Sequence, residues 1–245
     1  MCAHLAAGLS AAEAARAVLA DEAQGSNRSP LTTTAPGSAS ELTNAAEQLR
    51  DALGALDGDR AQQALDRLLA MFAFETVVRQ VLLPYLVEVG ARWQRGEPTI
   101  AEEHLATQVL RARLLALTHG SGSAGGARIV LACPPDEHHD LALIILATAL
   151  ERRGCPVTLL GANTPVATIL SAAEQTRAEC VVMAVTLPER IVAVAGELTR
   201  LSASRPLFLA GPGADEQLVD TLGATKLVGD PVAAAGELVE RLARA

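Results

Sequence analysis

The side chains best suited to chemistry fall into three groups at fixed intervals. Trp93 precedes the pair Glu103 and His104 by ten positions, and His139 follows His104 by 35 more, in the segment P-P-D-E-H-H-D. Neutral imidazole is the commonest transition-metal ligand, and a carboxylate bonded to its second nitrogen fixes the tautomer and raises its basicity. Glu137 stands two positions before His139. This pattern would suit a metal-binding histidine that a carboxylate supports.

Two explanations remain open for the run from Asp136 to Asp140. One is a solvated loop that caps the next helix, and the other is a ligand loop. A zinc site is disfavoured because no three or four ligands cluster with suitable spacing. One or two histidines instead suit a metal that brings most of its ligands with it, as the metal of a tetrapyrrole does.

Composition limits the class of protein. The chain has 245 residues, 50% of them hydrophobic and only 2% aromatic, which indicates an α or α/β protein of one or two domains. Its formal net charge is −8, and its Lys and Arg residues form no stripe, whereas phosphate contacts need clustered positive side chains. We therefore expect no direct binding of nucleic acid.

The cysteines and the apolar runs indicate a compartment. No C-x-x-C pair occurs, which favours buried thiols in a reducing cytosol. No apolar run approaches the roughly 20 residues of a membrane span, and no leader sequence is recognisable. We expect a cytoplasmic protein without membrane contact, in which four cysteines are core residues: Cys2, Cys133, Cys155 and Cys180.

Hydrophobic periodicity divides the chain into four parts. Residues 1–40 are expected to form a short helix and a flexible Ser/Thr/Pro/Gly-rich linker. Residues 41–118 have helical spacing with breaks at Asp57-Gly58 and at Gly96-Glu97-Pro98, which predicts a four-helix bundle. Glu103 and His104 fall in the second turn of its last helix. The Gly/Ser-rich residues 119–126 are expected to be a linker.

Residues 127–245 alternate short apolar runs with helical segments. The runs are A-R-I-V-L-A-C, P-V-T-L-L, E-C-V-V-M-A-V, P-L-F-L-A and K-L-V. Such strands are buried on both faces, and the alternation predicts a five-stranded parallel sheet in a Rossmann-like (flavodoxin-like) α/β domain. Ligands of these sheets bind beyond the carboxyl ends of the strands, which is where His139 falls.

These residues together resemble a known family. The segment from Pro135 to Ala142 is similar to the cobalamin-binding signature Asp-x-His-x-x-Gly, in the Glu-x-His variant of light-responsive regulators of the CarH/LitR type. Trp93 with Glu103-His104 resembles the Trp-x9-Glu-His motif of those photoreceptors, and the interval to His139 also fits. The resemblance covers residues 41–245, and a helix bundle before a Rossmann-like domain is the layout it implies.

The resemblance implies roles for individual residues. His139 would be the lower cobalt ligand, with Glu137 on its far nitrogen. Trp93 would cover the upper face and Glu103 would contact the adenosyl group, while His104 would become the upper ligand after light breaks the cobalt–carbon bond. Further cofactor contacts are expected at His138, Leu160, Gly161, Asn163, Thr164, Ala184, Thr186, Ala210 and Gly211.

The sequence departs from the family pattern in two ways. Ala142, Ala184 and Ala210 stand where the family has small Gly or Ser residues that line the groove for the nucleotide tail, so the groove is expected to be narrower. The DNA-reading domain of the family's repressors has no counterpart here, since residues 1–20 resemble only its last helix. That layout is also found in stand-alone photocobilins, which hold a bilin as well.

The resemblance therefore implies a sensor rather than an enzyme. Adenosylcobalamin would bind between bundle and sheet, and light would change self-association of a homo-oligomer or binding of a signalling partner. The likeness to photocobilins adds the hypothesis that biliverdin is a second chromophore. The alternative is a corrinoid carrier of a methyltransferase system. A third explanation is a regulatory module that has lost its cofactor.

Overall fold

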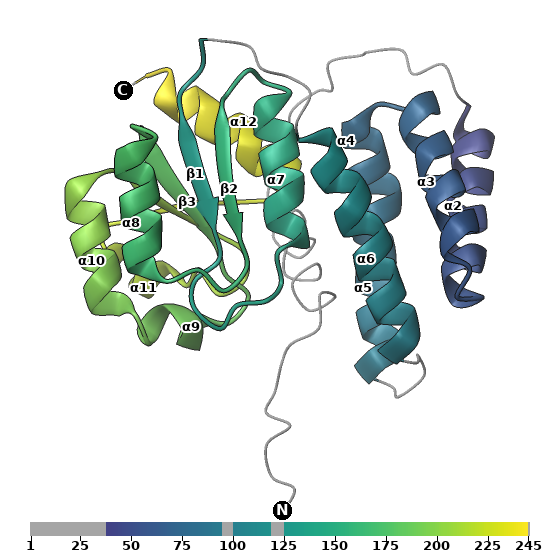
Figure 1. Cartoon of the computed structure of the whole chain (residues 1–245), viewed down its shortest axis with the longest axis horizontal. Helices are drawn as coiled ribbons and strands as arrows, with labels where there is room; N and C mark the ends of the chain where they lie inside the picture. Colours follow the sequence, from purple (N-terminus) through teal and green to yellow (C-terminus); the bar gives the residue numbers. More distant parts are fainter. Residues whose placement is uncertain (1–37, 95–99, 119–124, 245) are drawn as a thin grey trace, which may run out of the picture.

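The computed structural model describes residues 38–94, 100–118 and 125–244. Within these residues a helical part lies beside an α/β part (Figure 1). The short helix expected near the N-terminus and nearly all of the linker after it lie outside the described residues.

The helical part begins with two capped helices. Ser38 forms a capping box with Glu41, and Asp57 accepts a hydrogen bond from the backbone N–H of Arg60 at the expected break. The next three segments, α4, η1 and α5, follow one another without a break and form one continuous helix before the last helix, α6. The bounds are α2 (Ala39–Gly54), α3 (Gly58–Met71), α4 (Phe74–Val77), the π-helical turn η1 (Val78–Leu82), α5 (Leu83–Gln94) and α6 (Ile100–Leu117).

The π-helical turn departs from the uniform helix that the sequence pattern predicts. The N–H of Leu83 bonds to the carbonyl of Val78, five residues earlier. Pro84 follows directly; its ring has no N–H and crowds the carbonyl of the preceding turn, which a widened turn relieves. The continuous helix therefore extends past Pro84. Because the π-helical turn contains one extra residue, the apolar positions after it are shifted by about one residue relative to a regular α-helix.

The α/β part contains a sheet of five parallel strands. Their order is β2-β1-β3-β4-β5, with helices in the crossovers, so the predicted fold is confirmed. The strands are β1 (Ile129–Ala132), β2 (Val157–Gly161), β3 (Cys180–Ala184), β4 (Leu207–Ala210) and β5 (Thr225–Leu227). The helices are α7 (Leu141–Glu151), α8 (Val166–Gln175), α9 (Pro188–Val192), α10 (Ala195–Ser204), α11 (Glu216–Thr221) and α12 (Pro231–Leu242).

The two faces of the sheet have separate cores. Helices α8, α10 and α11 cover one face and form a core with the strand residues that point that way. Helices α7 and α12 cover the other face, and their core is continuous with that of the bundle (Figure 1). The bundle is thus joined to the sheet by an apolar interface.

Helix α7 lies at the centre of this interface. Every residue from Leu143 to Leu150 is buried, because one side of the helix contacts β1 and β2 and another side contacts α6. A helix that is apolar all round needs such a position, since no face of it can be left in water. The sequence L-A-L-I-I-L-A-T-A-L has this character.

Ion pairs at the edge of this interface also join the bundle to the α/β part, called the sheet domain below. Arg79 of η1 donates to the buried carboxylate of Asp230, the N-cap of α12, at 2.7 Å. Arg152, at the end of α7, lies 3.8 Å from Glu75 and 5.5 Å from the centroid of the Phe74 ring. These contacts fix how α4 and η1 sit against the sheet domain.

None of the helices within 38–94, 100–118 and 125–244 is long and apolar enough to cross a membrane. Cys133, Cys155 and Cys180 are buried free thiols, as expected, whereas Cys2 lies outside the described residues.

Truncation within α7 should be costly. We expect Ile144→Ala to lower the free energy of unfolding by about 2–5 kcal/mol, because its fully buried side chain would leave a cavity. Urea unfolding followed by circular dichroism measures this. The control is Val192→Ala, whose side chain is 61% exposed and whose loss should be nearly neutral. Equal effects of both variants would contradict the central role of α7.

Candidate functional site

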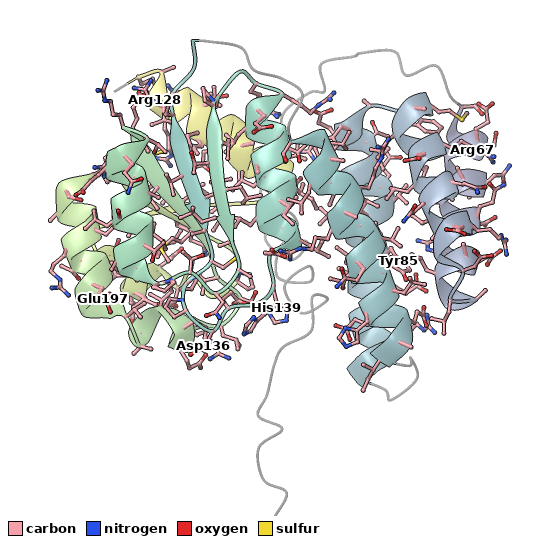
Figure 2. The ribbon with its side chains drawn as sticks, in the orientation of Figure 1. Arg67, Tyr85, Arg128, Asp136, His139 and Glu197 are labelled. Atoms are coloured by element: carbon pink, nitrogen blue, oxygen red, sulfur yellow. The ribbon has the colours of Figure 1, made fainter. Side chains whose placement is uncertain are left out.

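The site forms where the connectivity of the sheet reverses. Strands β2 and β3 flank β1 on opposite sides, so the loop after β1 and the loop after β3 diverge to opposite faces and leave a crevice. His139 lies in the first loop and Thr186 in the second. Figure 2 shows Asp136 and His139 at this carboxyl end of the sheet, with Arg128 at the opposite end.

A buried carboxylate joins these two loops. Glu137 is 2% exposed, and its Oε1 accepts hydrogen bonds from the ring Nδ1 of His139 at 2.6 Å and from the His139 backbone N–H at 3.0 Å. Its Oε2 accepts from the backbone N–H of Thr186 at 2.8 Å. Both oxygens therefore face donors, and the loop after β1 is held against the loop after β3.

The ionisation of Glu137 follows from this arrangement. Burial by itself would raise the pKa of Glu137, but the hydrogen bonds from the His139 ring, the His139 backbone and Thr186 lower it to about 2. The side chain is a carboxylate at neutral pH and can only accept. The proton of the His139 ring must then be on Nδ1, which leaves the lone pair of Nε2 free.

This donor set suits a metal that brings its own ligands. The His139 side chain is 25% exposed and so keeps access to the crevice. In the part of the chain that the structure describes, no group of three or more His, Cys, Asp or Glu side chains could hold a bare metal ion. A single oriented imidazole instead fits an axial position on a metal already held by a macrocycle.

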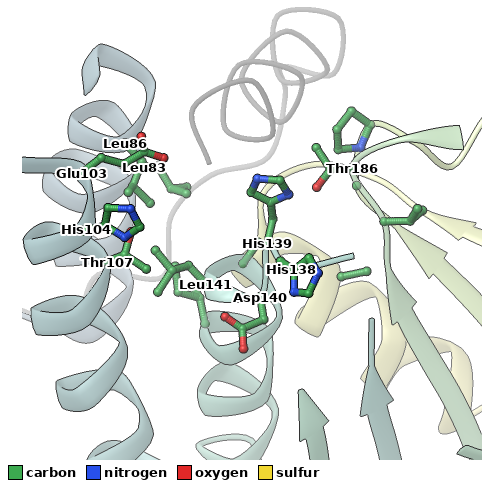
Figure 3. Close-up of a pocket in the computed structure, with 16 residues that line it drawn as sticks. Leu83, Leu86, Glu103, His104, Thr107, His138, His139, Asp140, Leu141 and Thr186 are labelled. Atoms are coloured by element: carbon green, nitrogen blue, oxygen red, sulfur yellow. The ribbon is translucent and has the colours of Figure 1, made fainter. Parts of the chain in front are cut away.

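A cavity of about 270 Å³ lies between the bundle and this loop. Glu103 and His104 of α6 face it from the bundle, and His139 faces it from the opposite wall (Figure 3). The lining residues are Leu83, Leu86, Glu103, His104, Thr107, His138, His139, Asp140, Leu141, Ala142, Ile145, Ala184, Val185, Thr186, Gly211 and Pro212. His104 thus faces one mainly apolar cavity from the bundle, and His138 and His139 line it on the opposite side.

The expected site residues divide into two sets. Glu103, His104, His138, His139, Ala184, Thr186 and Gly211 line the cavity, and Glu137 supports it from behind. The described lining does not include Leu160, Gly161, Asn163, Thr164 or Ala210. The first four belong to the end of β2 and the turn after it, which contacts the His139 loop from the side away from β3.

Trp93 falls at the end of α5, but its side chain is outside the described part of the structure. Its helix is held to α6 by Arg92, which donates to both carboxylate oxygens of Glu102, at 2.8 and 3.2 Å. Glu102 is only 6% exposed and directly precedes the Glu103-His104 pair. The ion pair therefore fixes the ends of the two helices that carry the candidate upper-face residues.

Two of the three departures from the small-residue pattern, at Ala142 and Ala184 but not at Ala210, fall at the cavity. Ala142 and Ala184 both line it, so their methyl groups occupy the wall where we expect a narrowed groove. Gly211 has a φ of +96°, and a Cβ there would lie 2.5 Å from the carbonyl oxygen of Val185. Its lack of a side chain lets the loops after β3 and β4 approach.

Sequence reasoning missed several lining residues. Thr107 is one turn beyond His104, and this helical spacing was the signal that could have placed it on the same face. Leu83 and Leu86 belong to α5, and the π-helical turn η1 before it determines which way their side chains point. Arg111 of α6 pairs with the buried Asp140, next to His139, and no local pattern predicted that contact.

Comparison with known proteins gives two family matches. Residues 45–118 match the model of one B12 binding domain, and residues 127–238 match the model of another with the same description. The first match covers the bundle and the second covers nearly all of the α/β part.

Two repressors from Myxococcus xanthus are similar in sequence. The HTH-type transcriptional repressor CarA is 35% identical over 189 residues, 73% of this chain and 64% of that protein. The HTH-type transcriptional repressor CarH is 40% identical over 119 residues, 49% of this chain and 40% of that protein. The chain thus spans less than two thirds of the length of either repressor.

Among solved structures, the monomethylamine corrinoid protein of Methanosarcina barkeri has a similar fold. Its TM-score is 0.67 at 14% identity, over 81% of this chain and 99% of that one. At this identity the likeness concerns the fold alone.

Replacing Glu137 should weaken the loop contact in a pH-dependent way. In Glu137→Gln the amide NH₂ must face either the Thr186 backbone N–H or the His139 backbone and ring N–H groups, so we expect a loss of about 2 kcal/mol in unfolding free energy near neutral pH. The carboxylate contribution is complete above its ordinary pKa of 4.5 and is lost as the pH falls towards 2. The difference from wild type should therefore shrink over that interval.

Denaturant titrations at a series of pH values measure this difference, and Glu189→Gln, at an exposed carboxylate, is the control. A deficit in Glu137→Gln that stays constant down to the lowest pH would contradict the assignment.

Proposed function

Because the chain carries two B12 binding domains, over residues 45–118 and 127–238, we propose that it is a cobalamin-dependent photoreceptor. Adenosylcobalamin binds between the bundle and the sheet domain. The observation that carries this proposal is the buried Glu137 holding His139 towards a cavity that His104 faces from the opposite wall. The two repressors similar to this chain support a regulatory role.

The lower side of the cofactor site is formed by the sheet domain. Glu137 keeps the proton of the His139 imidazole on Nδ1, so that Nε2 would be free to hold the cobalt. Thr186 holds Glu137 in place through its backbone N–H. His138, exposed at the cavity edge, would contact the periphery of the corrinoid.

The upper side is formed by the bundle. When bound, adenosylcobalamin would supply a cobalt–carbon bond that light can break. Trp93 would cover the adenosyl group and Glu103 would accept hydrogen bonds from it. His104, exposed on the cavity side of α6, would hold the cobalt after that group is lost.

The signal is a change in how the bundle packs. Contacts of α5 and α6 with the adenosyl group would exist only in the dark state, and the contact of His104 with cobalt only after light. The two states would therefore favour different arrangements of the two helices. We propose that this alters self-association or binding of a signalling partner. In this proposal the protein is a sensor and not a catalyst. A bilin bound as a second chromophore is a separate part of the proposal.

A corrinoid carrier of a methyltransferase system is the second candidate, and the fold shared with the monomethylamine corrinoid protein is compatible with it. A carrier needs an upper face open to a partner enzyme. The histidine and carboxylate of α6 facing the cavity favour the sensor instead.

Absorption spectroscopy tests the proposal. Protein loaded with adenosylcobalamin in the dark should show the adenosyl spectrum, and green light should convert it to a stable spectrum of cobalt bound by two histidines. His104→Ala should photolyse without reaching that final spectrum. No binding, or photolysis indistinguishable from that of free cofactor, would contradict the sensor, and a new far-red band after biliverdin is added would identify the bilin.

Replacing His139 should remove the lower ligand. We expect His139→Ala to lose the histidine-coordinated spectrum and to bind cobalamin at least about tenfold more weakly, because cobalt loses a protein ligand. The matched control is His138→Ala, which removes the adjacent, exposed imidazole and should keep the coordination. A His139→Ala variant that retained the wild-type spectrum would refute the assignment.

A further inference from the structure

The turn after β2 is hydrogen-bonded to the His139 loop at two successive residues. Asn163 accepts a hydrogen bond on its side-chain Oδ1 from the backbone N–H of Asp136 at 2.9 Å. Its own backbone N–H donates to the carbonyl of Glu137 at 2.8 Å. Asn163 therefore holds the peptide units on both sides of the Asp136–Glu137 bond.

Both residues in this contact adopt the left-handed conformation. Asp136 has a φ of 63° and Asn163 a φ of 48°. Asn and Asp are the non-glycine residues that visit this region most readily. The sequence of each turn therefore permits the left-handed conformation but does not require it. The hydrogen bonds between the two turns stabilise that conformation.

Asn163 is connected to the cavity through the loop that carries His139 and does not line the cavity itself. It is exposed and is not among the described residues that line the cavity, so its side chain is committed to Asp136 rather than to the cavity. This differs from the direct cofactor contact that the resemblance implies for it.

The other supports of the loop act elsewhere. Thr186 holds the Glu137 carboxylate from the β3 side. Arg190 approaches the Asp136 side chain only at 3.9 Å, and that side chain is 76% exposed, so the pair contributes little. Asn163 thus provides the side-chain support from the β2 side.

We propose that Asn163 is the positioning residue for the axial ligand. By fixing the backbone at Asp136 and Glu137, it aims the Glu137 carboxylate at His139 Nδ1 and so sets the direction of Nε2. The inference rests on the proposed cobalamin site, and it assigns the turn after β2 to ligand orientation instead of cofactor contact.

Three substitutions separate the side chain from the backbone conformation. Asn163→Asp keeps both the acceptor oxygen and a residue suited to the left-handed region. Asn163→Gly keeps the conformation but removes the acceptor. The control Arg177→Gly removes another exposed left-handed side chain, with a φ of 54°, ahead of β3 at the opposite end of the sheet.

The protein is produced with ¹⁵N-labelled histidine and loaded with cobalamin. Its cob(II)alamin form is then examined by electron paramagnetic resonance. Coordination by labelled imidazole splits the cobalt lines into two, whereas the cofactor's own unlabelled base splits them into three. We expect the histidine pattern in wild type, Asn163→Asp and Arg177→Gly. Asn163→Gly should lose part of it and bind cobalamin about tenfold or more weakly. Full histidine coordination and wild-type affinity in Asn163→Gly would overturn the proposal.

A second measurement needs no cofactor. Hydrogen exchange of the Asp136 amide in the apoprotein should be slow in wild type and Asn163→Asp and at least about tenfold faster in Asn163→Gly, because that amide loses its acceptor. The ¹⁵N chemical shifts of the His139 ring should show Nδ1 protonated in wild type and a mixture of tautomers in Asn163→Gly.

An unchanged ring tautomer in Asn163→Gly would overturn the positioning role even if cobalamin binds. Wild-type protein that binds no cobalamin, but shows the expected exchange and tautomer changes, would instead refute the proposed function and leave the Asn163–His139 coupling standing.

Discussion

The site depends on one buried carboxylate with donors on both oxygens. Glu137 bonds to the ring and backbone of His139 on one side and to the backbone N–H of Thr186 on the other. Such a group is costly to bury unless both of its oxygens accept hydrogen bonds, so the loss of either partner is unfavourable. The crevice between the loops after β1 and β3 therefore presents one imidazole nitrogen in a fixed direction.

The second constraint is the apolar interface between bundle and sheet. Helix α7 begins directly after the His139 loop and is buried between the sheet and α6. Arg111 of α6 pairs with Asp140 at the start of α7, and Arg79 of η1 pairs with Asp230 at the start of α12. A change at the bundle wall of the cavity would thus act on contacts that also border the loop carrying His139.

The residues around the cavity have two different physical tasks. His104 and His139 face the cavity, whereas Glu137 and Asn163 form hydrogen bonds within and to the loop that carries His139. The first pair is accessible from the cavity. The second pair removes conformational freedom from the loop and so restricts the direction of the His139 ring.

The sequence alone determined the five parallel strands, the helix break at Asp57-Gly58 and the loop that carries His139, because these follow from local periodicity, capping and turn residues. It could not supply the π-helical turn before Pro84 or the pairing of Arg111 with Asp140. The contact of Glu137 with Thr186 likewise joins residues 49 positions apart. Only the strand order, with β3 beside β1, brings them together, and that order is a property of the assembled sheet.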